Sequence, residues 1–412
     1  MKGNLIIVGD YNRGDFLYVA RVMHEHYNIY FLEYTHEAEI KSDQYKKWGK
    51  AIFWGDYNDA LELLDQIKPI RVVFYFIETF NHVALNVTCR YKGIRTYHME
   101  HGIRNYEMLQ TNFNHIDYQR KLTLVHILRK LKDIRSRLKG RFFFQNTVAK
   151  LPEAYSLFLK EYFRVRGSKT VFETFREINN PLRIAGCYIS FSPKIFEFHQ
   201  KSDHLSETYP VHFIGCPSFD YLADSAMNIS TGNNILFIDN AFETYHIFGW
   251  HEENKMQFLD QLVRFAESQD KKLWIKPHPY ANEKVYAASK KCLDVEFIED
   301  GKNFDEAIKD SKIIIGFYST LLMPLMAMEH TVCFSLEMHP SALEKEPSMF
   351  LVETGATKKI NNWEQLGNAF ENLDDVSNEQ KRFKKKFIED WLYKFDGKST
   401  ERLRNILMNE NS

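Results

Sequence analysis

The sequence predicts an α/β protein built from two doubly wound domains, each a parallel sheet covered by helices on both faces. The first observation is length, because 412 residues exceed one ordinary core at roughly 150 residues per domain. The second is an alternation of short apolar runs with amphipathic stretches, which indicates βαβ units. The third is that this alternation stops at a polar stretch, residues 217–232, and then starts again.

The first half of the chain contains the first set of alternating elements. Its apolar runs are rich in β-branched and aromatic residues, which predicts strands at 5–8, 29–32, 51–54, 71–77, 94–98 and 211–214. Helical periodicity between these runs predicts a helix from Phe16 to Met23 and helices at 60–67 and 83–91. The helix at 60–67 stops at Lys68-Pro69, because proline cannot continue a helix.

The second half repeats this scheme. Strands are predicted at 234–238, 272–276, 295–298, 312–315 and 331–335, and helices at 255–267, 304–308 and 321–328. The tail at 378–408 predicts one or two further helices with an interruption near Gly397. We therefore place an N-terminal domain at 1–216, a linker at 217–232, and a C-terminal domain with the terminal helices at 233–412.

Composition excludes several classes of protein. Lys and Arg number 54 against 55 Asp and Glu, so a net charge of −1 creates no global field that attracts nucleic acid. The 5 cysteines are scattered, which indicates buried thiols in a reducing compartment and neither a disulfide framework nor a zinc site. No apolar run approaches the roughly 18 residues that span a bilayer, and the first residues lack a signal peptide's apolar region. We therefore expect a cytoplasmic protein.

Polar residues that follow the predicted strands are the candidates for a functional site, because open parallel sheets bind ligands beyond the carboxyl ends of their strands. These residues are Asp10, Glu78, Glu100-His101-Gly102, Asp239-Asn240, Lys276-Pro277-His278-Pro279 and Tyr318-Ser319-Thr320.

The segment Lys276-Pro277-His278-Pro279 is the sharpest of these signals. Two prolines stiffen the backbone around His278, and a rigid imidazole beside a lysine suits a phosphate group. The alternative is a proline turn with a partly exposed histidine. A second signal decides for the phosphate: Gly316-Phe317-Tyr318-Ser319-Thr320 joins the next strand to an apolar helix. Ser319 and Thr320 are expected at the N-cap of that helix, where backbone N–H groups attract anions.

Three further residues are candidates for the chemical step. Asp239 ends the first strand of the second domain and suits a nucleophile or a base, although capping a helix is the simpler role. Glu100 and His101 offer an acid and a base from the first domain, with a tight turn and a surface histidine as the alternative.

The segment 119–141 is strongly basic. It contains nine Lys or Arg residues against the single acid Asp133, with apolar residues at helical spacing. A basic amphipathic helix of this kind is typical of peripheral contact with an anionic membrane surface, and a solvated outer helix face is the alternative.

Taken in order, Glu100-His101-Gly102, Phe213–Asp220, Lys276–Pro279 and Ser319-Thr320 resemble the motifs of GT-B glycosyltransferases. This fold comprises two facing Rossmann-like domains with a cleft between them. The pattern is most similar to bacterial enzymes that use CMP-activated acidic sugars: sialyltransferases, polysialyltransferases and β-Kdo transferases. The resemblance implies that His278, Ser319 and Thr320 hold the CMP phosphate, and that Asp305 or Glu306 is the nearest candidate for the ribose-binding acid.

The resemblance to retaining β-Kdo transferases further implies that Asp239 is a covalent nucleophile. The His-Gly, His-Pro and Ser-Thr order also resembles CDP-glycerol glycerophosphotransferases, and Tyr97–Arg104 resembles UDP-GlcNAc 2-epimerases. No zinc-protease, Asp-x-Asp or phosphate-loop motif is present, so neither a metal nor a cofactor is expected.

The resulting hypothesis is a transferase that passes Kdo, or a related acidic sugar, from CMP to a bacterial surface glycan or lipid-linked glycan. Lys276, His278, Pro279, Gly316, Tyr318, Ser319 and Thr320 are expected to bind the nucleotide. Asp239 is expected to form the glycosyl-enzyme, with Glu100 or His101 as acid or base. Three alternatives stay open: an inverting, sialyltransferase-like enzyme, a glycerophosphotransferase, and a binding module without turnover.

Overall fold

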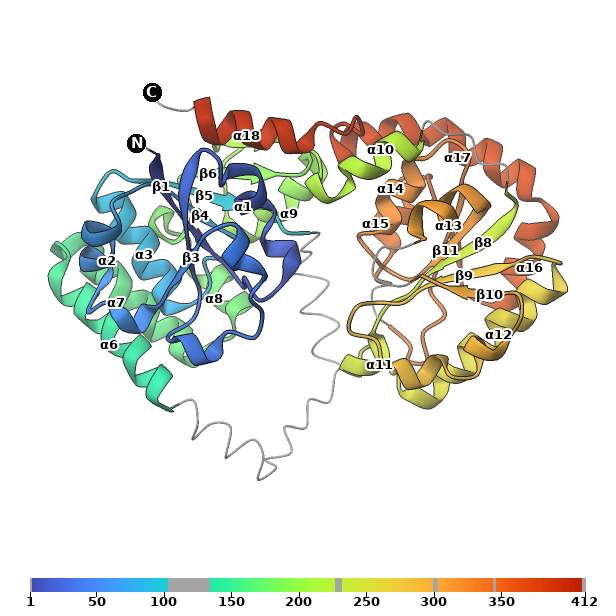
Figure 1. Cartoon of the computed structure of the whole chain (residues 1–412), viewed down its shortest axis with the longest axis horizontal. Coiled ribbons are helices and arrows are strands. Elements are labelled where there is room, and N and C mark those ends of the chain that lie inside the picture. The colour runs from blue at the N-terminus through green and yellow to red at the C-terminus, as the bar shows by residue number, and fades with distance from the viewer. Residues whose placement is uncertain (1, 103–133, 227–231, 299–302, 344–345, 410–412) are drawn as a thin grey trace. The chain divides into compact units, whose positions relative to one another are not determined.

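The computed structural model describes residues 2–102, 134–226, 232–298, 303–343 and 346–409. These residues form two compact α/β units, of which unit 1 comprises the described residues up to 218 together with 399–409, and unit 2 comprises those from 219 to 398. Each unit contains one parallel sheet with helices around it (Figure 1). The predicted fold class, two parallel-sheet α/β domains, is confirmed.

Unit 1 is built on a seven-stranded parallel sheet in the order β3-β2-β1-β4-β5-β6-β7. Its strands are β1 (Gly3–Val8), β2 (Tyr27–Leu32), β3 (Lys50–Ile52), β4 (Pro69–Phe74), β5 (Arg95–Met99), β6 (Cys187–Ser190) and β7 (Val211–Phe213). Its helices are α1 (Tyr18–Met23), α2 (Ala60–Ile67), α3 (Phe80–Tyr91), α6 (Ile134–Lys150), α7 (Glu153–Ser168), α8 (Val171–Glu177), α9 (Pro193–Asp203) and α18 (Ser399–Asn409).

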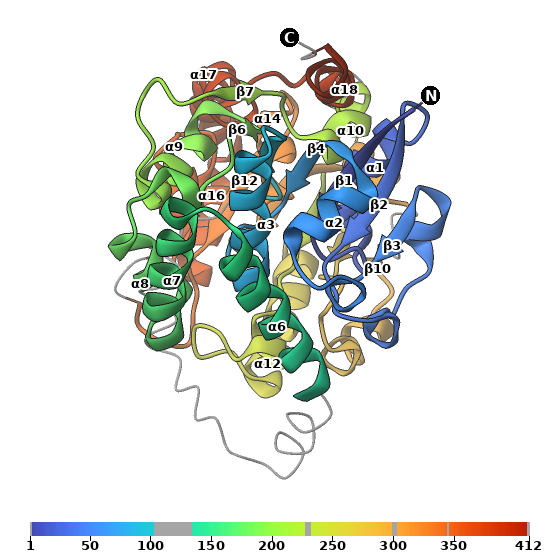
Figure 2. The same ribbon diagram turned by 90° about the vertical axis from the view of Figure 1, so that its left-hand side faces the viewer.

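The centre of this sheet is apolar on both faces. Leu5, Ile6, Ile7 and Val8 of β1 are at most 1% exposed, as expected for a parallel strand between two helical layers. Helices α2, α3, α6 and α7 pack against one another over one face (Figure 2). The strand order reverses between β1 and β4, and ligands of open α/β sheets bind beside such a switch point.

Unit 2 has a six-stranded parallel sheet in the order β10-β9-β8-β11-β12-β13, with its switch point between β8 and β11. The strands are β8 (Asn234–Ile238), β9 (Leu273–Lys276), β10 (Val295–Phe297), β11 (Ser311–Gly316), β12 (Val332–Leu336) and β13 (Lys358–Ile360). The helices are α10 (Asp220–Ala226), α11 (Phe242–Tyr245), α12 (Glu252–Ser268), α13 (Phe304–Asp310), α14 (Leu322–Ala327), α15 (Met349–Val352), α16 (Trp363–Glu371) and α17 (Leu373–Phe387).

The last helix, α18, belongs to unit 1, whereas the sequence placed it with the C-terminal domain at 233–412. Leu403 and Leu407 are fully buried, and the Leu407 carbonyl accepts hydrogen bonds from Arg71 and from the Tyr27 hydroxyl, the latter at 2.7 Å. Because Arg71 is itself 3% exposed, it needs this carbonyl as an acceptor. The return of the chain to unit 1 has no local sequence signal.

Other parts of the fold also differ from the sequence prediction. The 217–232 stretch, expected as a linker, contains α10, which packs on α13 and α14 of unit 2. Strands β6 and β13 were not predicted, because both are short and β13 carries two lysines.

Most of the basic segment 119–141 lies outside the described residues. No helix in the described part of the chain is long and apolar enough to cross a membrane.

Candidate active site

Three neighbouring strands of unit 2 end at the same level. In the β-sheet register, Ile238 of β8 is paired with Lys276 of β9 on one side and with Gly316 of β11 on the other. The three loops that carry the predicted site residues therefore leave the same edge side by side. The Asn240 side-chain amide donates to the Tyr318 carbonyl, and the Thr244 hydroxyl donates to the Tyr280 carbonyl at 3.0 Å. These bonds tie the β8 loop to both of its neighbours.

The loop after β9 presents His278 in a defined tautomer. The Tyr280 backbone N–H donates to His278 Nδ1 at 3.2 Å, so Nδ1 bears the lone pair and the ring proton lies on Nε2. His278 is half-buried, whereas Pro279 is exposed and provides no polar group. Lys276 is half-buried and its ammonium donates to the Pro277 carbonyl at 3.1 Å. The loop thus holds a ring N–H donor and an ammonium group within three residues.

The loop after β11 holds Tyr318, Ser319 and Thr320, all half-buried. The expected N-cap differs: α14 begins at Leu322, and its N-cap residue is Leu321. Ser319 instead forms a turn in which its hydroxyl accepts from the Leu321 N–H at 3.3 Å. Gly316 is required by close packing, because a Cβ there would lie 2.9 Å from Leu322 Cδ2 and 3.0 Å from the Ile238 carbonyl oxygen.

Asp239 lies in a buried charge cluster beneath these loops. Its side chain is fully buried, Lys255 donates to Oδ1, and the Tyr286 hydroxyl donates to Oδ2 at 2.6 Å. Glu243, also fully buried, has Oε2 3.9 Å from the same Lys255 ammonium. Burial, and then the Asp239 carboxylate, raise the pKa of Tyr286 far above its ordinary value, so its hydroxyl stays a donor.

This position does not suit the nucleophile that the sequence predicted. A nucleophile must reach the anomeric carbon of the donor, and both Asp239 oxygens are enclosed and hydrogen-bonded. The Asn240 backbone N–H also donates to Oδ1, at 2.6 Å. The geometry favours a positioning role, in which Asp239 fixes the start of the β8 loop.

Asp305, the candidate for the ribose-binding acid, is exposed on the first turn of α13. Its electrostatic neighbour is Tyr221 of α10, where burial and then the Asp305 carboxylate raise the pKa to about 12.

In unit 1, Glu100 follows β5 and is 1% exposed. Burial alone would raise its pKa, but the adjacent His199 imidazole outweighs that effect and lowers the pKa to about 2. His199 Nε2 lies 2.7 Å from Glu100 Oε2, while Oε1 accepts the backbone N–H groups of His101 and Gly102 at 3.0 and 3.3 Å. An enclosed carboxylate of this kind cannot donate a proton to substrate at neutral pH. The geometry favours a positioning role for Glu100, which holds the backbone N–H groups of the next two residues, over the expected acid or base role.

His101 itself is half-buried and packs against Phe16 in a tilted arrangement, with ring centroids 4.1 Å apart. A guanidinium nitrogen of Arg13 lies 3.4 Å from His101 Nε2. Because a guanidinium can only donate, Nε2 bears the lone pair in this arrangement. His101 is thus partly exposed, and its Nε2 lone pair faces the Arg13 guanidinium.

Sequence reasoning missed the partners of these groups. Lys255 and His199 lie on the buried faces of α12 and α9, at helical spacing from apolar residues such as Leu259 and Ile195. A charged or titratable residue on an apolar helix face was the available signal. Among the described residues, no group of three or more His, Cys, Asp or Glu side chains is placed to hold a metal ion.

Comparison with known proteins identifies the relatives of this chain. A family model described as alpha-2,8-polysialyltransferase matches residues 3–336. No curated protein matches the sequence significantly.

Solved structures resemble the chain in fold at very low sequence identity. The wall teichoic acid polymerase TagF matches with a TM-score of 0.54 and 12% identity, over 99% of this chain and 89% of that one. The UDP-GlcNAc 2-epimerase of Neisseria meningitidis, bound to UDP-GlcNAc, matches with a TM-score of 0.51 and 12% identity over 100% of both chains. The glycotransferase of kitacinnamycin matches with a TM-score of 0.52 and 9% identity over 99% of both.

Proposed function

The chain belongs to the alpha-2,8-polysialyltransferase family and is a glycosyltransferase, and on that premise we propose that it transfers an acidic sugar from a CMP donor to a hydroxyl group of an acceptor glycan. The acidic sugar is sialic acid or a chemically related sugar such as Kdo. Family membership supports the CMP donor class, and the choice among acidic sugars is left to the donor assay below.

The observation that carries the proposal is the common edge of unit 2. His278 carries an Nε2–H donor on the β9 loop, Lys276 supplies a positive charge, and Ser319 and Thr320 supply hydroxyl groups from the β11 loop. These groups match the needs of a departing phosphate, which gains negative charge as the sugar–oxygen bond breaks. Fixed donors at that position lower the barrier because they need no reorganisation during the reaction.

On the acceptor side, we assign the general base to His101. Its Nε2 accepts the proton of the acceptor hydroxyl, the hydroxyl oxygen attacks the anomeric carbon, and CMP leaves with the electron pair of the broken bond. Arg13 would then have to release Nε2 when the acceptor binds. Glu100 contributes by holding the backbone N–H groups of His101 and Gly102.

The burial of Asp239 supports a single displacement, with inversion at the anomeric carbon. A double displacement needs an exposed carboxylate, and Asp239 is enclosed by Lys255 and Tyr286. We therefore expect Asp239→Asn to keep measurable transfer, and intact-mass spectrometry of the wild type with donor alone to detect no glycosyl-enzyme. An adduct that is lost in Asp239→Asn would refute the single displacement.

Calorimetric titration with CMP tests the donor site. His278→Ala and Ser319→Ala are each expected to weaken CMP binding about 10- to 100-fold, the effect of losing one hydrogen bond to a charged group. His278→Gln should recover part of the affinity, because its amide can replace the ring donor. Ser268→Ala, which removes an exposed hydroxyl from the end of α12, is the control and should bind as the wild type does. Unchanged CMP affinity in His278→Ala would exclude this loop from the donor site.

Donor identity is tested by supplying CMP-sialic acid, CMP-Kdo and CDP-glycerol separately with an acceptor glycan and measuring the molecular masses of the products. The proposal expects an added acidic sugar and release of CMP. An added glycerol phosphate would instead make the enzyme a glycerophosphotransferase, the alternative that the sequence motifs left open.

A further inference from the structure

A cavity lies at the carboxyl edge of the sheet in unit 1, beside the elements that hold His101. It has a volume of about 620 Å³, within the roughly 300–1,000 Å³ typical of small-molecule sites. Residues after β2 and β3, the start of α3, and helices α6 and α7 line it. The loop between β4 and α3 connects it to the candidate base, because Phe76 packs beside His101 at 6.0 Å between ring centroids and Thr79 lines the cavity.

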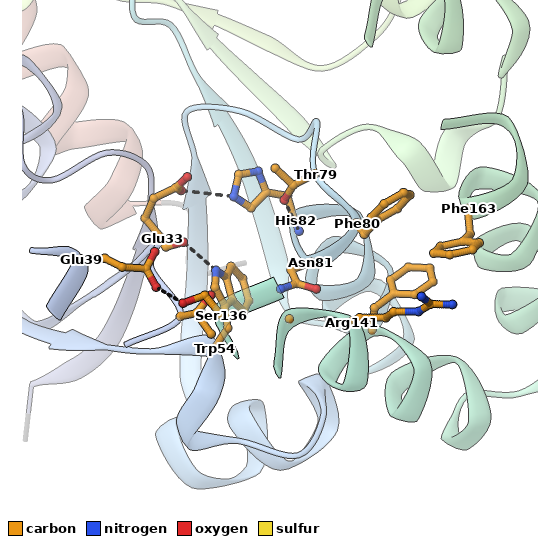
Figure 3. Close-up of a pocket in the computed structure, with 13 residues that line it drawn as sticks. Glu33, Glu39, Trp54, Thr79, Phe80, Asn81, His82, Ser136, Arg141 and Phe163 are labelled. Carbon is orange, nitrogen blue, oxygen red and sulfur yellow. Dashed lines mark hydrogen bonds and ion pairs between the residues drawn. The ribbon is translucent and has the colours of Figure 1, made fainter. Parts of the chain in front are cut away.

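The two sides of this cavity differ in chemistry (Figure 3). One side carries the carboxylates of Glu33 and Glu39 with the hydroxyl of Ser136, and the other carries the rings of Phe80 and Phe163. The rings belong to an aromatic cluster, in which Phe80 and Phe163 lie 4.9 Å apart and Phe144 lies 5.5 Å from each. An apolar side made of aromatic rings thus lies across the cavity from hydrogen-bond acceptors.

The carboxylates are held in place yet partly accessible. Glu33 is 22% exposed and its Oε2 lies 3.2 Å from His82 Nε2, while Glu39 is 33% exposed and accepts from the Ser136 hydroxyl at 3.0 Å. His82 is 3% exposed, and its Nδ1 has no hydrogen-bond partner in the part of the chain that the structure describes. The ring proton therefore lies on Nε2, where it donates to Glu33 and orients that carboxylate.

We propose that this cavity binds a neutral pyranose residue of the acceptor glycan. A pyranose ring has a face of C–H groups that packs on an aromatic wall, and an edge of hydroxyl groups that donate to carboxylates. Ionised Glu33 and Glu39 only accept hydrogen bonds, so the ligand must supply the donors. The inference rests on the proposed transferase function, because it takes the ligand to be part of the acceptor.

The charge of the lining selects against an acidic sugar here. Among the described residues that line the cavity, Glu33 and Glu39 contribute two negative charges, and Arg141, which lies exposed on α6, contributes one positive charge. His36 Nε2, which is charged only when the ring is protonated, lies 3.6 Å from Glu39 Oε1. A sugar carboxylate between them would meet more repulsion than attraction in a partly dry site. We therefore expect a sugar that binds in this cavity to be neutral.

Saturation-transfer NMR on the full chain tests this inference. The probes are methyl β-galactopyranoside, methyl β-glucopyranoside and, as the acidic counter-probe, the methyl glycoside of N-acetylneuraminic acid. We expect at least one neutral probe to bind, and to bind about 10-fold more weakly in Glu33→Gln and in Phe163→Leu. Glu37→Gln, an exposed carboxylate in the same segment, is the matched control and should leave the affinity unchanged.

Two results would overturn the inference: binding of the acidic probe alone, or neutral binding that both variants leave unchanged. Thermal unfolding of each variant checks that it folds, and Phe163→Leu keeps an apolar side chain against Phe80 and Phe144. CMP titration of the same samples separates the two proposals. Intact CMP binding without neutral-sugar binding refutes only the cavity assignment, whereas neutral-sugar binding without CMP binding refutes the donor proposal.

Discussion

Replacing Lys255 with methionine is expected to destabilise unit 2 far more than replacing its partner Asp239 with asparagine. The buried cluster contains two carboxylates, Asp239 and Glu243, and the single ammonium of Lys255, with all three side chains at most 1% exposed. Lys255→Met leaves two like charges in the interior without a cation. Asp239→Asn leaves Lys255 opposite Glu243, so the remaining pair is neutral.

The magnitudes follow from these contacts. The Lys255 ammonium lies 3.9 Å from Glu243 Oε2, a separation at which unit charges attract by about 4 kcal/mol at an effective dielectric constant of 20. Removing one partner of a buried pair costs about 3–5 kcal/mol, so we expect at least ~4 kcal/mol for Lys255→Met. Asparagine keeps an acceptor for the Tyr286 hydroxyl, and we expect about 1–2 kcal/mol for Asp239→Asn.

Hydrogen exchange followed by mass spectrometry measures this local stability, through peptides that cover β8 and β11. Exchange from those peptides should accelerate strongly in Lys255→Met and only moderately in Asp239→Asn. Lys291→Met, at an exposed lysine of the same unit, is the control and should exchange as the wild type does. Equal acceleration in the two cluster variants would refute the reasoning, because it would mean that the two carboxylates are not both charged.

Three further outcomes are expected from urea unfolding at controlled pH. Glu100→Gln should cost about 3 kcal/mol at pH 7, and the cost should vanish as the pH falls from 4.5 toward 2, because a lowered carboxyl pKa stabilises the fold only above that range. Glu197→Gln, on the exposed face of α9, should cost under about 1 kcal/mol. Burial lowers the pKa of Lys384 to about 8. The wild type should therefore gain stability relative to Lys384→Met as the pH rises from 8 to 10.5. A stability difference between the two proteins that stays constant over this range would contradict the prediction. Leu407→Ala, at a fully buried position of α18, should cost unit 1 about 2–5 kcal/mol, and no loss would mean that α18 does not support that unit.

The sequence by itself determined the fold class and the positions of the loops that matter. Strand β8 and helix α2 were predicted at their observed bounds, because a continuous apolar run and a 3.6-residue periodicity each report local structure directly. The strand ends also placed His101, His278 and Ser319 on loops at sheet edges. The family to which the chain belongs agrees with the glycosyltransferase resemblance of the sequence motifs.

Only the tertiary structure decided which of these residues are accessible. Asp239 and His278 follow the ends of adjacent strands, so position in the sequence does not tell which of them is accessible. In the structure, Asp239 is enclosed by Lys255 and Tyr286, whereas His278 is half-buried. Likewise Glu100 lies inside with His199, while the next residue reaches solvent. The reason is physical: burial, ionisation and ion pairing depend on groups far apart in the chain, and no local pattern encodes which distant partner will neutralise a given charge.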